Sequence, residues 1–153
     1  MGYRKVLVAF DGSKGSMDAL KQGMDYMKDD QFREFTIVNV VNAEPEPAYV
    51  APGAIPPVVQ RNEVQENKQV ELVEKGEQTI NEAKTALIKE NMHANIIVLE
   101  GEPAKRICDY AEEHEMDLII IGNRGLSGLK KLVQGSVSQK VTKQASCSVL
   151  VVK

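Results

Sequence analysis

Two glycine-containing segments have residue types and a spacing that could bind an anion. Gly122-Asn123-Arg124-Gly125 is separated by nine residues from Gly135-Ser136. Glycines let main-chain amides approach an anion closely, and a helix beginning near Ser136 would add free amides and the positive end of its dipole. The pattern suits phosphates, although it is neither a Walker loop nor a Gly-x-Gly-x-x-Gly fingerprint. Turn glycines followed by a capped helix would give the same residues, so both interpretations stay open.

A second candidate segment is Asp11-Gly12-Ser13-Lys14-Gly15-Ser16, which follows the first apolar run. It has the composition of a phosphate loop, but the Asp11 carboxylate would repel phosphate. We therefore interpret Ser13 and Ser16 as helix caps. For Asp11 we favour a ligand-binding role over the alternative, an acidic group that stabilises a helix N-terminus by about 0.3–1 kcal/mol.

Other site chemistries are not expected. His93 and His114 are the only histidines, and neither has a second His or Cys nearby at metal-ligand spacing. Cys108 and Cys147 lie far apart in the sequence, which is typical of reduced cytosolic thiols packed in a core. The sequence shows no nucleophile paired with a base, no carboxylate pair and no metal triad, so it predicts no catalytic site.

The elements that must position these residues are indicated by the hydrophobic pattern. Five short apolar runs are nearly continuous and rich in β-branched residues, which is typical of parallel strands covered on both faces. They are Val6–Phe10, Phe35–Val41, Ile96–Leu99, Leu118–Ile121 and Val149–Val152.

Helical patterns lie between these runs, with apolar residues at spacings of three and four. The residues expected to face inward are Met17, Leu20, Met24, Met27, Val73, Gly76, Ile80, Ala83, Leu87, Ala104, Ile107, Cys108, Ala111, Val137 and Val141. The second helix should end near Asn91, the third should begin at Pro103, and Ser136-x-x-Gln139 should form a capping box for the fourth. Alternating strands and helices predict an α/β fold with right-handed crossovers, in which ligands bind at the carboxyl ends of the strands.

The segment from Asn42 to Pro57 interrupts this alternation. It contains Glu44-Pro45-Glu46-Pro47 and Pro52-Gly53-Ala54-Ile55-Pro56-Pro57, which predict neither helix nor central strand. We expect a flexible loop over about residues 42–60, inserted in a single domain that covers residues 1–153.

The composition is typical of one soluble globular domain, with 42% hydrophobic and 27% charged residues among 153. The net charge of −3 lacks the basic excess of nucleic-acid-binding proteins. The N-terminal apolar run is too short for a signal peptide or a membrane span. We therefore expect a cytoplasmic protein with neither a nucleic-acid nor a membrane partner.

The chain resembles the universal stress protein family along its whole length. The resemblance rests on Lys5-Val-Leu-Val-Ala-Phe-Asp-Gly-Ser13, Gly122-Asn-Arg-Gly125, Gly135-Ser-Val-Ser138 and Ser148-Val-Leu-Val-Val-Lys153. The intact Gly-x2-Gly-x9-Gly-Ser pattern resembles the family's ATP-binding branch. The resemblance implies a Rossmann-like sheet of five parallel strands in the order 3-2-1-4-5 with helices on both faces. It also implies homodimers and a regulatory role in stress survival.

The same resemblance implies a binding site for ATP or ADP, with Mg²⁺ accompanying the phosphates. Asp11 would accept hydrogen bonds from the ribose or the adenine amine, while Ala9 would line the adenine slot, where many relatives carry Pro. The main chain of Val40 would contact the adenine edge, and Ile121 would pack against sugar and base. The phosphates and ribose would be bound by Gly122, Gly125, Gly135, Ser136, Val137 and Ser138. Independently of the resemblance, the charge of Arg124 in the glycine loop could screen the phosphates.

Three functions remain in view. We favour a dimeric ATP-binding regulatory module that acts on an unknown client protein. The second is a slow ATP hydrolase or nucleotidyl-transfer enzyme, which should carry a further signature such as His-x-Gly-His. The third is a nucleotide-free interaction protein. An open apolar edge strand at Val149, Leu150, Val151 and Val152 would expose unpaired backbone groups, so we expect it to pair with its copy in a homodimer.

Overall fold

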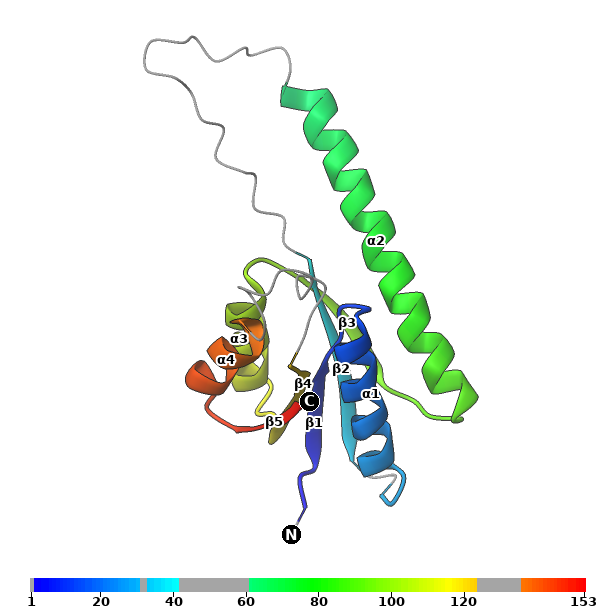
Figure 1. Cartoon of the computed structure of the whole chain (residues 1–153), viewed down its shortest axis with the longest axis vertical. Coiled ribbons are helices and arrows are strands. Elements are labelled where there is room, and N and C mark those ends of the chain that lie inside the picture. Colours follow the sequence, from blue (N-terminus) through cyan, green and yellow to red (C-terminus); the bar gives the residue numbers. More distant parts are fainter. Residues whose placement is uncertain (1, 31–32, 42–60, 124–135) are drawn as a thin grey trace.

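The computed structural model describes residues 2–30, 33–41, 61–123 and 136–153, with side chains described throughout these ranges except in residues 61–73. Figure 1 shows a central sheet with helices on either side. The Pro-rich segment at about 42–60 lies outside the described ranges, so its predicted flexibility stays a prediction.

Strands and helices alternate along the described chain, as the hydrophobic pattern predicts. The elements are β1 (Lys5–Ala9), α1 (Lys14–Met27), β2 (Glu34–Val41), α2 (Arg61–Lys89), β3 (Asn95–Glu100), α3 (Pro103–Glu113), β4 (Leu118–Gly122), α4 (Ser136–Gln144) and β5 (Ser148–Val152). All the strand pairs are parallel, and the order is β3-β2-β1-β4-β5. This confirms the predicted α/β, Rossmann-like fold and its strand order.

β1 lies at the centre of the sheet, between β2 and β4. Val8 is in register with Ile37 on one side and with Ile120 on the other. From β1 the chain first builds outward through β2 and β3, and then crosses to build β4 and β5 on the opposite side. The carboxyl ends of β1 and β4 therefore meet where the strand order reverses, which is where open α/β sheets bind ligands.

Each face of the sheet is covered by its own pair of helices (Figure 1). The core beneath α1 and α2 is centred on Val6, Val8, Leu20, Ile37 and Ile120. The core beneath α3 and α4 contains Leu7, Val38, Ile107, Ile119 and Val141. Alternate residues of β1 thus contribute to opposite cores, which explains why its apolar run is continuous. No helix in the described ranges is both long and apolar enough to cross a bilayer.

The helix ends follow from local chemistry. Ser13 is the N-cap of α1, and its Oγ accepts a hydrogen bond from the Ser16 amide at 3.2 Å. Glu102 caps α3 by accepting from the Lys105 amide at 2.8 Å, and Pro103 follows as predicted. α2 ends at Lys89, slightly before the predicted position, because Asn91 adopts a left-handed conformation with φ of 52°.

Several predicted boundaries differ from the observed ones by one residue, in all five strands and at the start of α4. Phe10 falls outside β1, although its amide still donates to the Val38 carbonyl at 2.9 Å. Ser136 is the first residue of α4 and not its cap, so the cap position falls on residue 135, outside the described ranges.

Candidate functional site

Four apolar residues meet at the carboxyl edge of the sheet on the α3 and α4 side. Ala9, Val40, Ile121 and Val137 all belong to or pack against the same core. Val8 and Ile120 are register partners, so the residues that follow them, Ala9 and Ile121, are neighbours on adjacent strands. We call these four residues the apolar ledge. The structure thus brings together the predicted base-lining residues and the predicted Val137.

Asp11 lies directly beyond the end of β1 and is half-buried. Its Oδ1 accepts a hydrogen bond from the Ser13 amide at 2.9 Å. The carboxylate therefore stabilises the turn that leads into α1 through a hydrogen bond, whereas the alternative weighed from the sequence was a helix-dipole interaction. The two roles are compatible, because a carboxylate has two oxygens with about four acceptor positions.

The hydroxyls of Ser13 and Ser16 take part in hydrogen bonds within the same turn. Ser16 Oγ donates to the Ser13 carbonyl at 2.9 Å and accepts from the Asp11 amide at 3.3 Å. Ser13 is a true cap, whereas Ser16 lies inside the first turn of α1 and stabilises it from there. These bonds fit a structural turn and not a phosphate loop.

Gly122 packs against the backbone of this turn. A methyl group placed on it would lie 2.5 Å from the carbonyl carbon and oxygen of Gly15 and 3.0 Å from the Ser16 nitrogen. These distances are far below ordinary contact distances, so only glycine fits without a shift. Gly122 therefore has a packing role that its sequence pattern did not indicate.

The start of α4 lies at the same end of the sheet, because α4 returns from the carboxyl edge to the start of β5. Ser136 and Val137 are half-buried and Ser138 is buried. The first-turn amides of α4 provide the donors and the positive dipole end that an anion needs. Arg124, Gly125 and Gly135, which were predicted to bind phosphate, lie outside the described residues.

Asn39 was not predicted and organises the exit of β1. It is 6% exposed, and its Nδ2 donates to the Phe10 carbonyl at 2.9 Å. Its Oδ1 is buried with no hydrogen-bond partner in the described part of the chain. The sequence signal that could have identified Asn39 is its polar side chain inside the apolar run Phe35–Val41.

The α2 helix also reaches this edge. Gly12 has φ of +84°, and a methyl group on it would lie 3.4 Å from Glu82 Oε2 and 3.6 Å from Thr79 Oγ1. The turn after β1 is therefore held between α2 on one side and β4 on the other.

The two histidines lie away from this site. His93 precedes β3 and His114 precedes β4, so both lie at the amino edge of the sheet, and both are exposed. Cys108 and Cys147 are free thiols on the α3 and α4 side, and burial raises the pKa of each. In the described ranges, no group of three His, Cys, Asp or Glu side chains could hold a metal ion.

Comparisons with known proteins agree with the fold and with the motifs. The model of the universal stress protein family matches residues 2–153. Universal stress protein YxiE of Bacillus subtilis is 34% identical over 153 residues, which cover 99% of each chain.

Solved structures show the same fold. The structure of MJ0577, a protein of Methanocaldococcus jannaschii, has a TM-score of 0.79 at 25% identity and covers 100% of this chain and 97% of that one. A universal stress protein family protein of Arabidopsis thaliana with AMP bound has a TM-score of 0.62 at 17% identity, covering 97% and 90%. With a family match over nearly the whole chain and the expected strand order, this chain belongs to the universal stress protein family.

Proposed function

We propose that the chain binds an adenine nucleotide, ATP or ADP, at the junction of β1 and β4, and acts as a dimeric regulatory module. The observation that carries the proposal is the convergence of three features at this junction. They are the apolar ledge, the Asp11 carboxylate and the N-terminus of α4.

Each feature fits one part of a nucleotide. The ledge would supply the apolar contacts of a purine site, most accessibly at the half-buried Val40 and Val137, whereas Ala9 and Ile121 are only 9% and 5% exposed. A carboxylate at Asp11 accepts hydrogen bonds from ribose hydroxyls or from the adenine amine, but it repels phosphates. The α4 N-terminus and the glycines of the motif attract phosphates. The AMP bound to the Arabidopsis relative supports the adenine assignment.

Mg²⁺ would arrive with the phosphates. Mg²⁺ commonly keeps several waters and binds through phosphate oxygens, with few protein ligands.

The module is proposed to be non-catalytic. Hydrolysis needs a group that activates water within hydrogen-bond reach of the phosphates. Both histidines lie at the opposite edge of the sheet, and the proposal places the Asp11 carboxylate at the ribose or adenine and not at the phosphates. Turnover of bound ATP should therefore be slow, and the occupied state itself would be the signal.

The direct experiment is mass spectrometry of ligand released from freshly purified, heat-denatured protein, followed by calorimetry with ATP, ADP, AMP and GTP. We expect adenine nucleotides to bind and GTP to bind more weakly. Millimolar ATP with Mg²⁺ should raise the thermal midpoint, since a hundredfold excess over Kd stabilises the native state by about 2.7 kcal/mol. No released nucleotide, no binding heat and an unchanged midpoint would together refute the nucleotide assignment.

Two substitutions at Asp11 separate binding from structure. Asp11→Asn keeps an acceptor for the Ser13 amide and removes the charge, whereas Asp11→Ala removes both. A hydrogen bond to a charged group contributes about 1.5–3 kcal/mol, so Asp11→Ala should weaken adenosine binding by roughly 10- to 150-fold. Asp11→Asn should lose affinity while keeping wild-type stability. Unchanged affinity in both variants would remove Asp11 from the site.

A further inference from the structure

A groove of about 880 Å³ lies between α1 and α2, on the face of the sheet opposite the apolar ledge. Its apolar lining consists of Met17, Met24 and Ala86, which belong to or pack against the core. None of the residues predicted to bind nucleotide lines it. The groove is therefore a separate surface feature, and its apolar floor consists mainly of methionine, of which Met17 is half-buried and Met24 is 5% exposed.

The groove runs along two helices that point in the same direction. α1 and α2 each return from the carboxyl edge of a parallel sheet to its amino edge, so their axes are roughly parallel (Figure 1). From Met17 to Lys28 the α1 side covers three turns, about 16 Å at 1.5 Å per residue. This length matches three turns of a helix that lies along the groove between α1 and α2.

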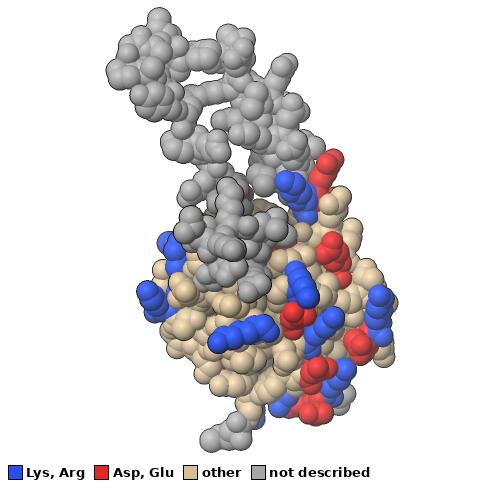
Figure 2. All heavy atoms as spheres, in the orientation of Figure 1, with Lys and Arg blue, Asp and Glu red and all other residues tan. Residues whose placement is uncertain are grey.

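Charged side chains form the rims. Lys and Arg alternate with Asp and Glu over the side of the molecule formed by α1 and α2 (Figure 2). Lys28 is bound near one end of the groove, 3.1 Å from Asp25 and 3.3 Å from Glu90.

Three other charges on the rims have no ion-pair partner among the described side chains. They are Lys21 on α1 and Glu82 and Lys89 on α2. Glu82 lies near the carboxyl-edge end, because it approaches Gly12 in the turn before α1. The unpaired charges therefore form a polar pattern, with one acid near the carboxyl edge and a lysine on each rim.

We propose that this groove docks an amphipathic helix of a client protein. The helix would place an apolar stripe of three turns on the methionine floor. It would present acidic side chains to Lys21 and Lys89 and a basic side chain to Glu82. Methionine suits a surface that receives more than one apolar sequence, because its unbranched thioether adapts to the shape of its partner. The charge pattern determines which way the helix points.

The shape of the groove favours this occupant over two others. A second copy would present an identical concave groove, so a two-fold pairing of the two grooves would leave the methionine floors apart. A small molecule would stay exposed along the open side of a groove this long, whereas ligand pockets bury most of their ligand.

The test is a displayed library of 14-residue helical peptides with a fixed leucine stripe and flanking positions varied among Glu, Gln and Lys. The full chain is the immobilised target. We expect selection of Glu at the flanking positions that face the two lysines, with an enrichment of about two- to fivefold per position over Lys. The double variant Lys21→Glu/Lys89→Glu should reverse this preference, since both side chains are exposed and can be replaced without loss of the fold.

A matched control carries the same number of charge reversals outside the groove. Lys75→Glu/Lys84→Glu changes two exposed lysines of α2 that do not line it, and it should select peptides as the wild type does. Ala86→Trp, which fills the floor, should abolish selection while circular dichroism stays native.

The proposal fails if no peptide is enriched over the bare support, or if all four targets select the same flanking residues. It also fails if self-association is lost in Lys21→Glu/Lys89→Glu and kept in the control, because a second copy would then be the occupant. None of these outcomes depends on nucleotide binding, so the two proposals can be tested separately.

Discussion

At the scale of single residues, close backbone contact between the end of β4 and the first turn of α1 shapes the candidate site. Gly122 brings the end of β4 against Gly15 and Ser16, so the β4 end and the turn before α1 form one packed unit. The Asp11 carboxylate belongs to that turn through its bond to the Ser13 amide. A change at Gly122 should therefore alter the stability of the protein, and it should also shift the position of Asp11.

Gly122→Ala should lower the free energy of unfolding by about 1–3 kcal/mol, because a methyl group would overlap the Gly15 backbone. Urea denaturation followed by circular dichroism measures this change. Asp11→Asn, which keeps the turn acceptor, is the control and should stay within about 0.5 kcal/mol of the wild type. Equal stability of Gly122→Ala and wild type would show that the end of β4 and the first turn of α1 are not held in contact.

The two cysteines should react slowly with thiol reagents in the native state. Burial raises the pKa of Cys108 and of Cys147, so little thiolate is present at neutral pH. Labelling at pH 7.5 should be slow until denaturant is added, and Cys147 should react before the more buried Cys108. Fast native labelling of Cys108 would contradict its placement in the core.

The same pKa shifts predict a loss of stability at alkaline pH. A raised folded-state pKa means that, as the pH rises, the unfolded chain releases its thiol protons at a lower pH than the folded chain does. The stability contributed by the buried thiols is therefore complete below the unfolded pKa, about 8.5, and is lost as pH rises through the folded pKa. Replacing both cysteines with alanine should flatten the decline of the thermal midpoint between pH 8 and pH 10. An equally steep decline in that variant would assign it to other groups.

The residue pattern predicted part of the site and missed the rest for a physical reason. The family resemblance named Ala9, Val40 and Ile121 as site residues. The apolar pattern agrees with their common location, because each ends or nearly ends an apolar run and parallel strands end at one edge. The bond from Asn39 to the Phe10 carbonyl joins residues 29 positions apart, and the contact of Gly122 with Gly15 joins the end of β4 to the start of α1. Such contacts depend on how the strands are ordered in space, which local patterns do not encode.

At the scale of elements, the helices contain two buried glycines in contrasting surroundings. A methyl group on Gly23 in α1 would lie 2.8 Å from Val8 Cγ2 and 3.0 Å from Phe35 Cε2. On Gly76 in α2 the sole contact with a described residue would be Val41 Cγ1, at 3.6 Å. The first glycine is required by close packing of α1 on the sheet, whereas the second leaves room for a methyl group.

Gly76→Ala should stabilise the protein by about 0.5–1 kcal/mol, because alanine favours the helix and fills available space. Gly23→Ala, the matched change in the other helix, should destabilise it by about 1–3 kcal/mol through overlap with Val8 and Phe35. Differential scanning calorimetry of both variants measures the contrast. A destabilising Gly76→Ala would mean that α2 lies closer to β2 than the structure has it.

Element boundaries were predictable to within a residue or two, since local signals determine them. Pro103 begins α3, and the left-handed Asn91 follows the end of α2. The order of the strands could not be predicted from local signals, because the apolar runs alone indicate a parallel sheet and do not say which strands are neighbours. The order 3-2-1-4-5 came from the family resemblance, and the structure confirms it.

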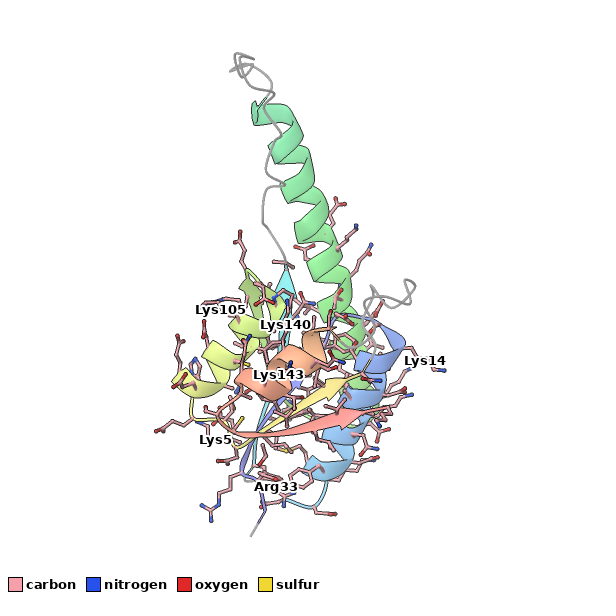
Figure 3. All side chains as sticks on the ribbon, turned by 60° about the vertical axis from the view of Figure 1, so that its left-hand side comes forward. Lys5, Lys14, Arg33, Lys105, Lys140 and Lys143 are labelled. Atoms are coloured by element: carbon pink, nitrogen blue, oxygen red, sulfur yellow. The ribbon has the colours of Figure 1, made fainter. Side chains whose placement is uncertain are left out.

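At the scale of the whole molecule, the sheet has two edge strands, β3 and β5. Each presents one outward apolar side chain of similar exposure, Val98 at 46% on β3 and Leu150 at 43% on β5. Figure 3 shows β5 running along the outer side of the sheet. The predicted homodimer uses β5, so the two edges offer a matched comparison.

Leu150→Lys should shift the protein from dimer to monomer, because a charged side chain on β5 discourages pairing of this edge with its copy. Val98→Lys places the same charge on β3 and should leave the dimer intact. Sedimentation velocity at tens of micromolar measures both. A monomeric wild type, or equal effects of the two variants, would refute a dimer through β5.

The central position of β1 has a consequence for how the protein is made. β1 is synthesised before the other strands of this sheet, but its second neighbour, β4, begins only at Leu118. At about 5–20 residues per second, synthesis from Val41 to Leu118 takes on the order of 4–15 s. During that interval the middle of the finished sheet is an open edge of a nascent chain, vulnerable to mispairing. Any ligand of the β1 and β4 junction can stabilise the completed domain, but it cannot protect the chain while this edge waits for its partner.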